Sequence, residues 1–240
     1  MDPKLQPVFT NEQPALPRTG ETVVLSDQNR VLRNTYWLLA LSMLPTIVGA
    51  WAGMQFNFIK LFAAAPIMTP LLMFGLMIGS LFVVTRLRNS AWGVPALFGF
   101  TFIAGAMLTP ILSVAAQFKN GGQLVALSGG MTAAIFLAMA AIATVTKRDF
   151  SFMSKFLFVG LILLIVASVA NLFFQVPAVS LSISAIAVFI FSLYILHDVS
   201  NIVRGGETNY ISATLALYLD LINVFQSLLA LLGILGGERD

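Results

Sequence analysis

The chain has 240 residues, of which 58% are hydrophobic and 10% are charged, with a formal net charge of +3, one histidine and no cysteine. An ordinary soluble domain carries about 25% charged residues, so this composition excludes a soluble globule and indicates a membrane protein. The missing cysteines exclude disulfides, thiolate catalysis and cysteine-ligated metals. A single histidine excludes a multi-histidine metal site, and the small net charge does not indicate nucleic-acid binding.

The N-terminal stretch, residues 1–29, is polar and holds four of the ten prolines. Such a segment cannot bury enough apolar surface to fold by itself, so it is predicted to be a flexible cytosolic tail. It is not predicted to be a signal peptide, because no short apolar run with a cleavage site begins the chain. Residues 30–240 are predicted to form the transmembrane domain.

Apolar segments long enough to cross a membrane follow the tail, since a spanning helix needs about 20 such residues. Seven are predicted, at 35–56, 65–85, 92–118, 123–145, 155–176, 179–203 and 211–235. The last one carries Asp220, Asn223 and Ser227 on one helical face, with further polar side chains nearby. Lipid cannot satisfy so many polar groups. The predicted fold is therefore an all-α membrane protein of seven helices, six surrounding a central C-terminal seventh.

Prolines and glycines within the spans predict local geometry. Pro45, Pro70 and Pro110 are expected to kink their helices, because proline removes a backbone donor and crowds the preceding turn. The pairs Gly49–Gly53 and Gly75–Gly79 have the spacing that allows two membrane helices to approach closely. They are interpreted as sites of general helix packing.

The distribution of lysine and arginine predicts the orientation, because cytoplasmic loops are enriched in both. With the N-terminus inside, the cytosolic side holds ten of the thirteen basic residues: Lys4, Arg18, Arg30, Arg33, Arg86, Arg88, Lys147, Arg148, Lys155 and Arg204. The other side holds Lys60, Lys119 and Arg239. Seven crossings then place the C-terminus in the periplasm. The alternative is a seventh segment that enters the membrane and returns, which would leave the C-terminus in the cytosol.

Two carboxylates in the last two spans, Asp198 and Asp220, are the strongest functional signal. An ionisable group within a membrane helix costs roughly 2.5 kcal/mol or more and usually faces the protein interior or a water-filled cavity. If the two meet, they share a proton and titrate as a unit, and their oxygens can bind a hard cation such as calcium. The alternative is that each is satisfied separately, Asp198 by Arg204 or water.

Three further side chains are candidates for the same site. His197 is expected to point about 100° away from its neighbour Asp198 around the helix and to make a polar contact near the interface. Arg86 is interpreted as a positive anchor, or as a latch that pairs with an aspartate and closes the cytosolic side. Asn223 is a secondary candidate because it shares the face of Asp220.

Enzymatic activity is not predicted. Two membrane aspartates also occur in intramembrane aspartyl proteases, where a shared proton activates water. Here the residues before Asp220 are Leu217-Tyr-Leu219, which lack the usual Gly-x-Gly-Asp context. The sequence contains neither a nucleophile–base set nor a phosphate-binding loop.

Three stretches resemble the Bax-inhibitor-motif family, also called the Bax inhibitor-1 family, and most closely its bacterial YccA branch. They are Val31-Leu-Arg-Asn-Thr-Tyr-Trp-Leu-Leu39, Ser200-Asn-Ile-Val-Arg-Gly-Gly-Glu-Thr-Asn-Tyr-Ile211 and Leu228-Leu-Ala-Leu-Leu-Gly-Ile234. The resemblance extends from Arg30 to Gly236 and implies six helices around a central seventh.

The resemblance implies two functions. Members of the YccA branch restrain the inner-membrane protease FtsH, which engages their flexible N-terminal tail, with HflK–HflC as further partners. Other bacterial members are pH-sensitive calcium leak channels, in which paired aspartates on the last two helices act as the sensor. Asp198 and Asp220 match these aspartates. An acidic residue at position 220 departs from the YccA branch, so protease regulation is the first expectation and a calcium leak the alternative.

Overall fold

The computed structural model describes residues 19–65, 68–146 and 148–237, and helices are the only regular secondary structure in these ranges. The helices are α1 (Thr19–Gln55), α2 (Phe58–Ala64), α3 (Met68–Leu87), α4 (Gly93–Met107), α5 (Thr109–Ala115), α6 (Gly121–Thr146), α7 (Ser154–Phe174), α8 (Pro177–Val203) and α9 (Tyr210–Gly236), with the short 3-10 helix η1 (Ser151–Met153). The predicted all-α class is therefore confirmed.

Every predicted span coincides with a helix or a helix pair. Six described helices are long and apolar enough to cross a membrane, and the bent pair α4 and α5 makes a seventh if it counts as one span. The two halves of that pair meet at 40°. Pro110 lies in the first turn of α5, directly after the bend, which confirms the predicted kink there. Pro70 lies in the first turn of α3, where a missing donor is tolerated.

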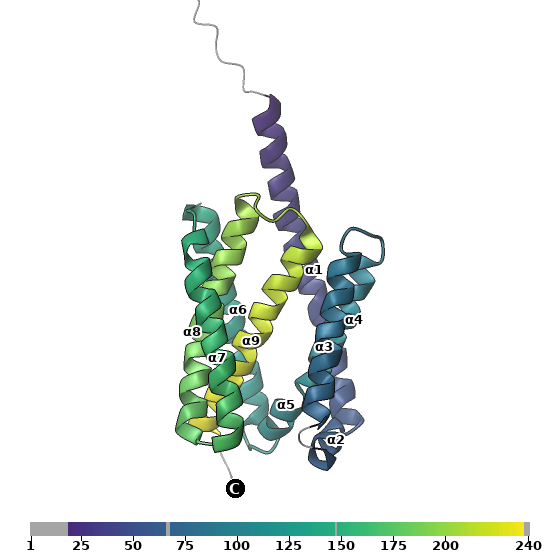
Figure 1. Ribbon diagram of the computed structural model, residues 1–240, viewed down its shortest axis with the longest axis vertical. Helices are drawn as coiled ribbons and strands as arrows, with labels where there is room; N and C mark the ends of the chain where they lie inside the picture. The colour runs from purple at the N-terminus through teal and green to yellow at the C-terminus, as the bar shows by residue number, and fades with distance from the viewer. Residues whose placement is uncertain (1–18, 66–67, 147, 238–240) are drawn as a thin grey trace, which may run out of the picture.

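The N-terminal boundary differs from the expected one. The first helix begins at Thr19, so residues 19–29 of the predicted flexible tail are helical. No proline occurs between Pro17 and Pro45, and the helix therefore has no obstacle to extending beyond the span that begins at Asn29. Figure 1 shows this part of α1 projecting beyond the other helices. Residues 1–18 of the tail lie outside the described part.

Helix α9 runs obliquely between α6, α7 and α8 on one side and α1, α3 and α4 on the other (Figure 1). It packs against α1, α4, α5, α6 and α8, whereas α3 packs mainly on α4 and α7 on α8. The predicted enclosure of α9 by all six other spans is thus not confirmed. The helix is uninterrupted, and it ends at the opposite end of the bundle from the start of α1, which disagrees with a re-entrant segment.

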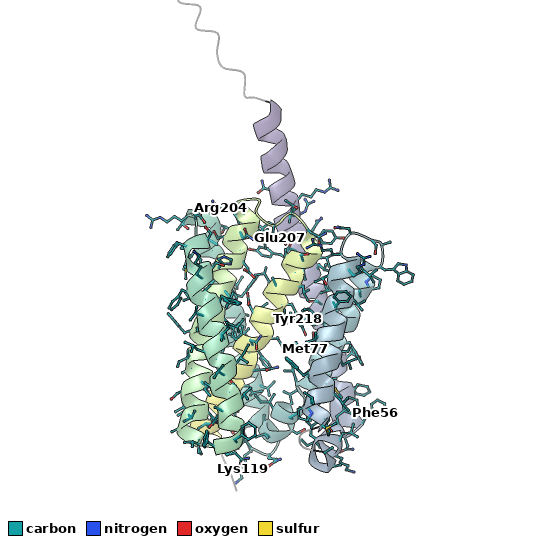
Figure 2. The ribbon with its side chains drawn as sticks, in the orientation of Figure 1. Phe56, Met77, Lys119, Arg204, Glu207 and Tyr218 are labelled. Atoms are coloured by element: carbon teal, nitrogen blue, oxygen red, sulfur yellow. The ribbon has the colours of Figure 1, made fainter. Side chains whose placement is uncertain are left out.

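The centre of the bundle is fixed by Tyr218 of α9, whose position Figure 2 shows midway along the helices. Its side chain is fully buried, and its hydroxyl lies 2.8 Å from Thr46 Oγ1 of α1 and 3.3 Å from the carbonyl oxygen of Thr101 of α4. Its ring meets Phe100 edge to face, with centroids 5.9 Å apart. Three helices are therefore joined at one buried polar point.

Close packing of α1 on α4 explains one of the two glycine pairs. A Cβ on Gly49 would overlap the backbone of Phe102, and one on Gly53 would lie 3.2 Å from the Ala106 carbonyl oxygen. On the facing helix, a Cβ on Gly105 would overlap the backbone of Thr46. By contrast, a Cβ on Gly75 or Gly79 of α3 would meet nothing within 4 Å. The predicted close approach is therefore confirmed for the first pair and not seen for the second.

Candidate functional site

The two candidate aspartates are brought together by the α8–α9 hairpin. Asp198 lies about 8 Å before the end of α8 and Asp220 about 15 Å after the start of α9, at 1.5 Å per residue. The helices pack side by side, so the two carboxylates lie on neighbouring helices. The hairpin therefore allows the pairing that the sequence predicts, with Asp220 deeper in the bundle.

Asp220 is the buried member of this pair. Its side chain is 5% exposed, and its Oδ2 atom has no hydrogen-bond partner among the described residues. A buried carboxyl group without a donor is costly for a fold, and such exceptions in native structures call for a specific explanation.

Asp198 is partly exposed, and its side chain contacts His197 rather than Arg204. His197 Nδ1 lies 2.8 Å from Asp198 Oδ1, and the two side chains are 18% and 22% exposed. The expectation that His197 points away from Asp198 is therefore wrong, because rotation of the imidazole about its side-chain bonds brings it back to its neighbour. Arg204 does not pair with Asp198. It forms an ion pair with Asp149 instead.

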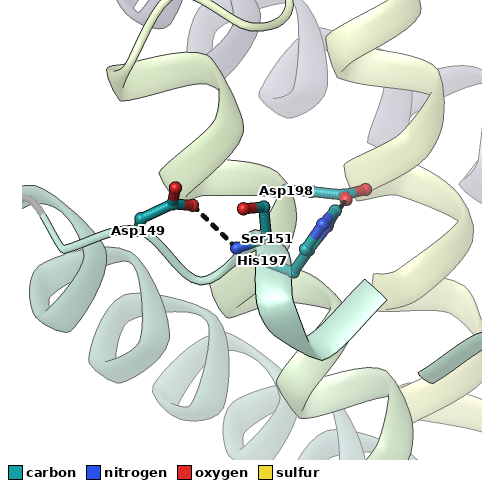
Figure 3. Close-up of polar contacts among 4 residues, drawn as sticks. All are labelled: Asp149, Ser151, His197 and Asp198. Atoms are coloured by element: carbon teal, nitrogen blue, oxygen red, sulfur yellow. Dashed lines mark hydrogen bonds and ion pairs between the residues drawn. The ribbon is translucent and has the colours of Figure 1, made fainter. Parts of the chain in front are cut away.

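Asp149 belongs to the connection between α6 and η1, and it joins this connection to the end of α8. Figure 3 shows it with Ser151, beside His197 and Asp198. Its Oδ1 atom accepts a hydrogen bond of 2.8 Å from the Ser151 backbone N–H. Hydrogen bonds from Ser151, followed by the contact with Arg204, lower the pKa of Asp149 to about 2. A second bond, from Ser200 Oγ to the Arg148 carbonyl oxygen at 2.8 Å, fixes the same connection.

Asn209 organises the link between α8 and α9. Its Oδ1 accepts hydrogen bonds from the N–H groups of Ile211 and Ser212, so it caps α9. Its Nδ2 donates to the Arg88 carbonyl oxygen at 3.1 Å and to Asn89 Oδ1 at 2.7 Å, both in the connection between α3 and α4. One side chain thus starts the helix that carries Asp220 and ties it to a neighbouring loop.

A tight turn precedes this cap. Gly205 has a φ of 77°, a conformation that other residues adopt only with strain. The N–H of Gly206 then donates to the Asn201 carbonyl oxygen at 2.9 Å. The turn closes α8 and sets the direction of the chain toward Asn209.

The remaining candidates do not contact the aspartates. Arg86 is exposed at the end of α3 and forms no ion pair with either aspartate in the described structure. Its neighbour Arg88 reaches α9 instead, donating from Nη1 to Ser212 Oγ at 3.1 Å. Asn223 donates to the Leu219 carbonyl oxygen within its own helix at 2.7 Å. A latch at Arg86 therefore stays a prediction that requires another conformation.

Cation binding at the pair would need ligands beyond carboxylates. Within residues 19–65, 68–146 and 148–237, no group of three or more His, Cys, Asp and Glu side chains is arranged to hold a metal ion. Calcium takes six to eight oxygen ligands, so water or carbonyl oxygens would have to complete a site at Asp198 and Asp220.

Comparison with known proteins identifies relatives along nearly the whole chain. Residues 28–237 match the family Bax1-I, described as inhibitor of apoptosis-promoting Bax1. An uncharacterized membrane protein from Vibrio cholerae is 40% identical over 232 residues, which is 97% of this chain and 98% of that protein. The modulator of FtsH protease YccA from Escherichia coli K12 is 38% identical over 209 residues, 87% of this chain and 92% of the relative. The same match is found for the inner membrane protein YccA of E. coli O6:H1.

Proposed function

The chain belongs to the Bax inhibitor family, and on this premise we propose that it is an inner-membrane regulator of an FtsH-type protease. The observation that carries the proposal is the 38% identity to a protein named as a modulator of that protease, over 87% of this chain. A regulator of this kind acts by binding, and we propose no catalytic reaction for it.

The N-terminal part is the proposed point of engagement. Helix α1 continues from Asn29 back to Thr19, about 15 Å beyond the span, and residues 1–18 precede it. A membrane-anchored protease that processes chains from an end requires an accessible segment outside the bilayer. This segment provides one if the N-terminus is cytoplasmic, as the charge distribution favours. HflK–HflC are proposed as further partners in the same assembly.

The association is tested by crosslinking and copurification in cells that contain the protease. The full chain carries a C-terminal tag, and a variant lacking residues 2–18 is the matched comparison, because this deletion removes no residue from a span. The full chain should copurify with the protease and be degraded slowly by it. The shortened chain should persist longer. Equal lifetimes of the two chains, with and without the protease, would contradict engagement of the tail.

The membrane orientation forms part of the proposal. The Arg204 end and the Lys119 end lie at opposite ends of the bundle (Figure 2), as the alternating charge pattern requires. We propose a cytoplasmic N-terminus, a periplasmic C-terminus and α9 as the central helix. A reporter fused after the last residue should be active only in the periplasm. Activity in the cytoplasm would rule out this orientation.

A pH-sensitive calcium leak is the second candidate, and the buried, unpartnered Asp220 favours it. Its neighbour Asp198 is partly exposed and bonded to His197. A proton shared by such a pair can control whether α8 and α9 remain packed. On this account the aspartates act as a gate and as transient cation ligands.

Calcium flux through the purified protein in vesicles, measured between about pH 6 and pH 8, tests the second candidate. Asp198→Asn, Asp220→Asn and the double variant should shift or flatten the pH dependence. The double change should have less effect than the sum of the single changes. Asp149→Asn is the comparison for the loss of a carboxylate near the end of α8 that is not part of the pair, because Asp149 lies between two spans. A wild type that conducts at no pH would exclude the leak and leave protease regulation standing.

A further inference from the structure

A cavity of about 580 Å³ lies between α1, α6 and α9, with Leu108 and Leu112, at the start of α5, contributing to one end. Its walls are almost wholly apolar, for example Met43 of α1, Gly129 of α6 and Phe225 of α9. Pockets of this size commonly hold small organic ligands. Neither the proposed protease contact nor the aspartate pair uses it.

The cavity opens sideways, between two helices that cross the membrane. Helices α1 and α6 meet at Tyr36 and Phe136, whose rings contact edge to face with centroids 5.6 Å apart. From this contact the cavity continues along α1 as far as Ala50, about 21 Å at 1.5 Å per residue. Ile47, which lines it, is 64% exposed. The groove therefore faces the hydrocarbon of the bilayer.

The dimensions fit an acyl chain, whereas a whole helix is too large to be enclosed. One leaflet of hydrocarbon is about 15 Å deep, and the groove is about 6 Å longer. A helix segment about 20 Å long and 10 Å wide would occupy roughly 1,600 Å³, nearly three times the cavity volume. At roughly 30 Å³ per group, the volume of a water molecule in the liquid, the cavity accommodates on the order of 15–20 groups of methylene size.

Positive charge follows the groove along the chain. Ala50, at one end of the groove, lies near the end of α1, and the next helix, α2, carries Lys60. Helix α2 packs on α1 and α5, which both line the groove. The charge of Lys60 complements the phosphate of a phospholipid whose acyl chain enters the groove from the same surface.

We propose that the groove between α1 and α6 is a binding site for one phospholipid, with an acyl chain in the cavity and the phosphate near Lys60. The chain packs against Tyr218 on the face of α9 that is opposite Asp220, since two residues correspond to about 200° around a helix. The occupant thereby supports the helix that carries the aspartate.

The test uses the full chain in vesicles of phosphatidylethanolamine and phosphatidylglycerol that contain a trace of phosphatidylglycerol with a diazirine on its acyl chain. After irradiation, the labelled residues are located by mass spectrometry. Labelling should be concentrated on the groove residues of α1 and α6 relative to α3, whose exposed apolar residues contact ordinary bilayer lipid. Equal labelling of α3 and α6 would refute the site.

Gly129→Phe and Gly130→Phe form a matched pair. A Cβ at either position meets nothing within 4 Å, but only Gly129 lines the cavity. The first change should fill the groove and lower its labelling by about tenfold, which is about 1.4 kcal/mol of binding free energy. The second should leave labelling unchanged. Ala133→Phe provides a second filling variant, because Ala133 is an exposed lining residue.

The phosphate contact is tested separately. The change Lys60→Gln should reduce labelling by the phosphatidylglycerol probe more than labelling by a phosphatidylethanolamine probe. Arg86→Gln, at the other end of the bundle, should change neither. A groove that is protected from both probes, together with a dimer in crosslinked samples, would show a second copy there and overturn the proposal. These outcomes do not depend on whether the protein binds a protease.

Discussion

Asn209 has two separable roles, and substitutions can distinguish them. Its Oδ1 caps α9, whereas its Nδ2 ties the cap to Arg88 and Asn89. Asn209→Ser keeps a capping oxygen and loses the two donated bonds. Net hydrogen bonds contribute about 1 kcal/mol each, and these two are exposed, so the expected loss is about 1 kcal/mol in total. Asn209→Ala also loses the cap, which adds about 1 kcal/mol.

The free energy of unfolding is measured by SDS titration in mixed micelles, followed by the fluorescence of the three tryptophans. The expected order of stability is wild type, then Asn209→Ser, then Asn209→Ala. Thermal midpoints should fall by about 2–4 °C per kcal/mol. Asn89→Ala removes only the hydrogen bond between Asn209 and Asn89 and leaves the cap intact, so it should destabilise less than Asn209→Ser. Because both variants lose this same bond, combining them should cost less than the sum of the two single losses. A serine variant as damaged as the alanine variant would refute a separate capping contribution.

Two further predictions concern the loop after α6 and the packing of α1 on α4. Hydrogen bonds from Ser151 lower the pKa of Asp149 from 3.8 to about 2, so its contribution to stability is present above the ordinary pKa and is lost as the pH falls through about 2. Asp149→Asn should therefore flatten the acid limb of a stability–pH curve, and an unchanged limb would contradict this contact. Gly105→Ala should destabilise by about 1–3 kcal/mol through overlap with the Thr46 backbone. Gly79→Ala should leave stability unchanged or raise it by up to about 1 kcal/mol. Equal losses of stability in the Gly105→Ala and Gly79→Ala variants would refute the conclusion that only Gly105 is closely packed.

The spans could be predicted because their signal is contained in uninterrupted stretches of sequence. About 20 apolar residues are required wherever a helix crosses a bilayer, and all seven predicted segments overlap described helices. The start of α1 could not be predicted from polarity alone. Residues 19–29 are polar, yet they continue a helix whose nucleus is already formed within the membrane.

The aspartate pair was identified from the cost of charge within a span, and its placement on adjacent helices follows from the short link. Its surroundings could not be predicted, because they depend on residues distant in sequence. Asp149 competes for Arg204, and rotation of a side chain brings His197 to Asp198. Asn209 carried a usable signal, since asparagine directly before an apolar helical run is typical of an N-cap.

The most direct test of the proposed regulation is reconstituted proteolysis. An FtsH-type protease and a membrane-protein substrate are placed in vesicles with increasing amounts of this chain, and the rate of substrate loss is followed. A chain lacking residues 2–18 and an unrelated multi-pass protein are the controls. Protease regulation predicts that substrate degradation slows in proportion to the amount of full chain and is restored in part when the N-terminal residues are absent. The function proposed for this protein would be contradicted if the substrate is degraded at the same rate with the full chain, with the unrelated protein and with no added protein.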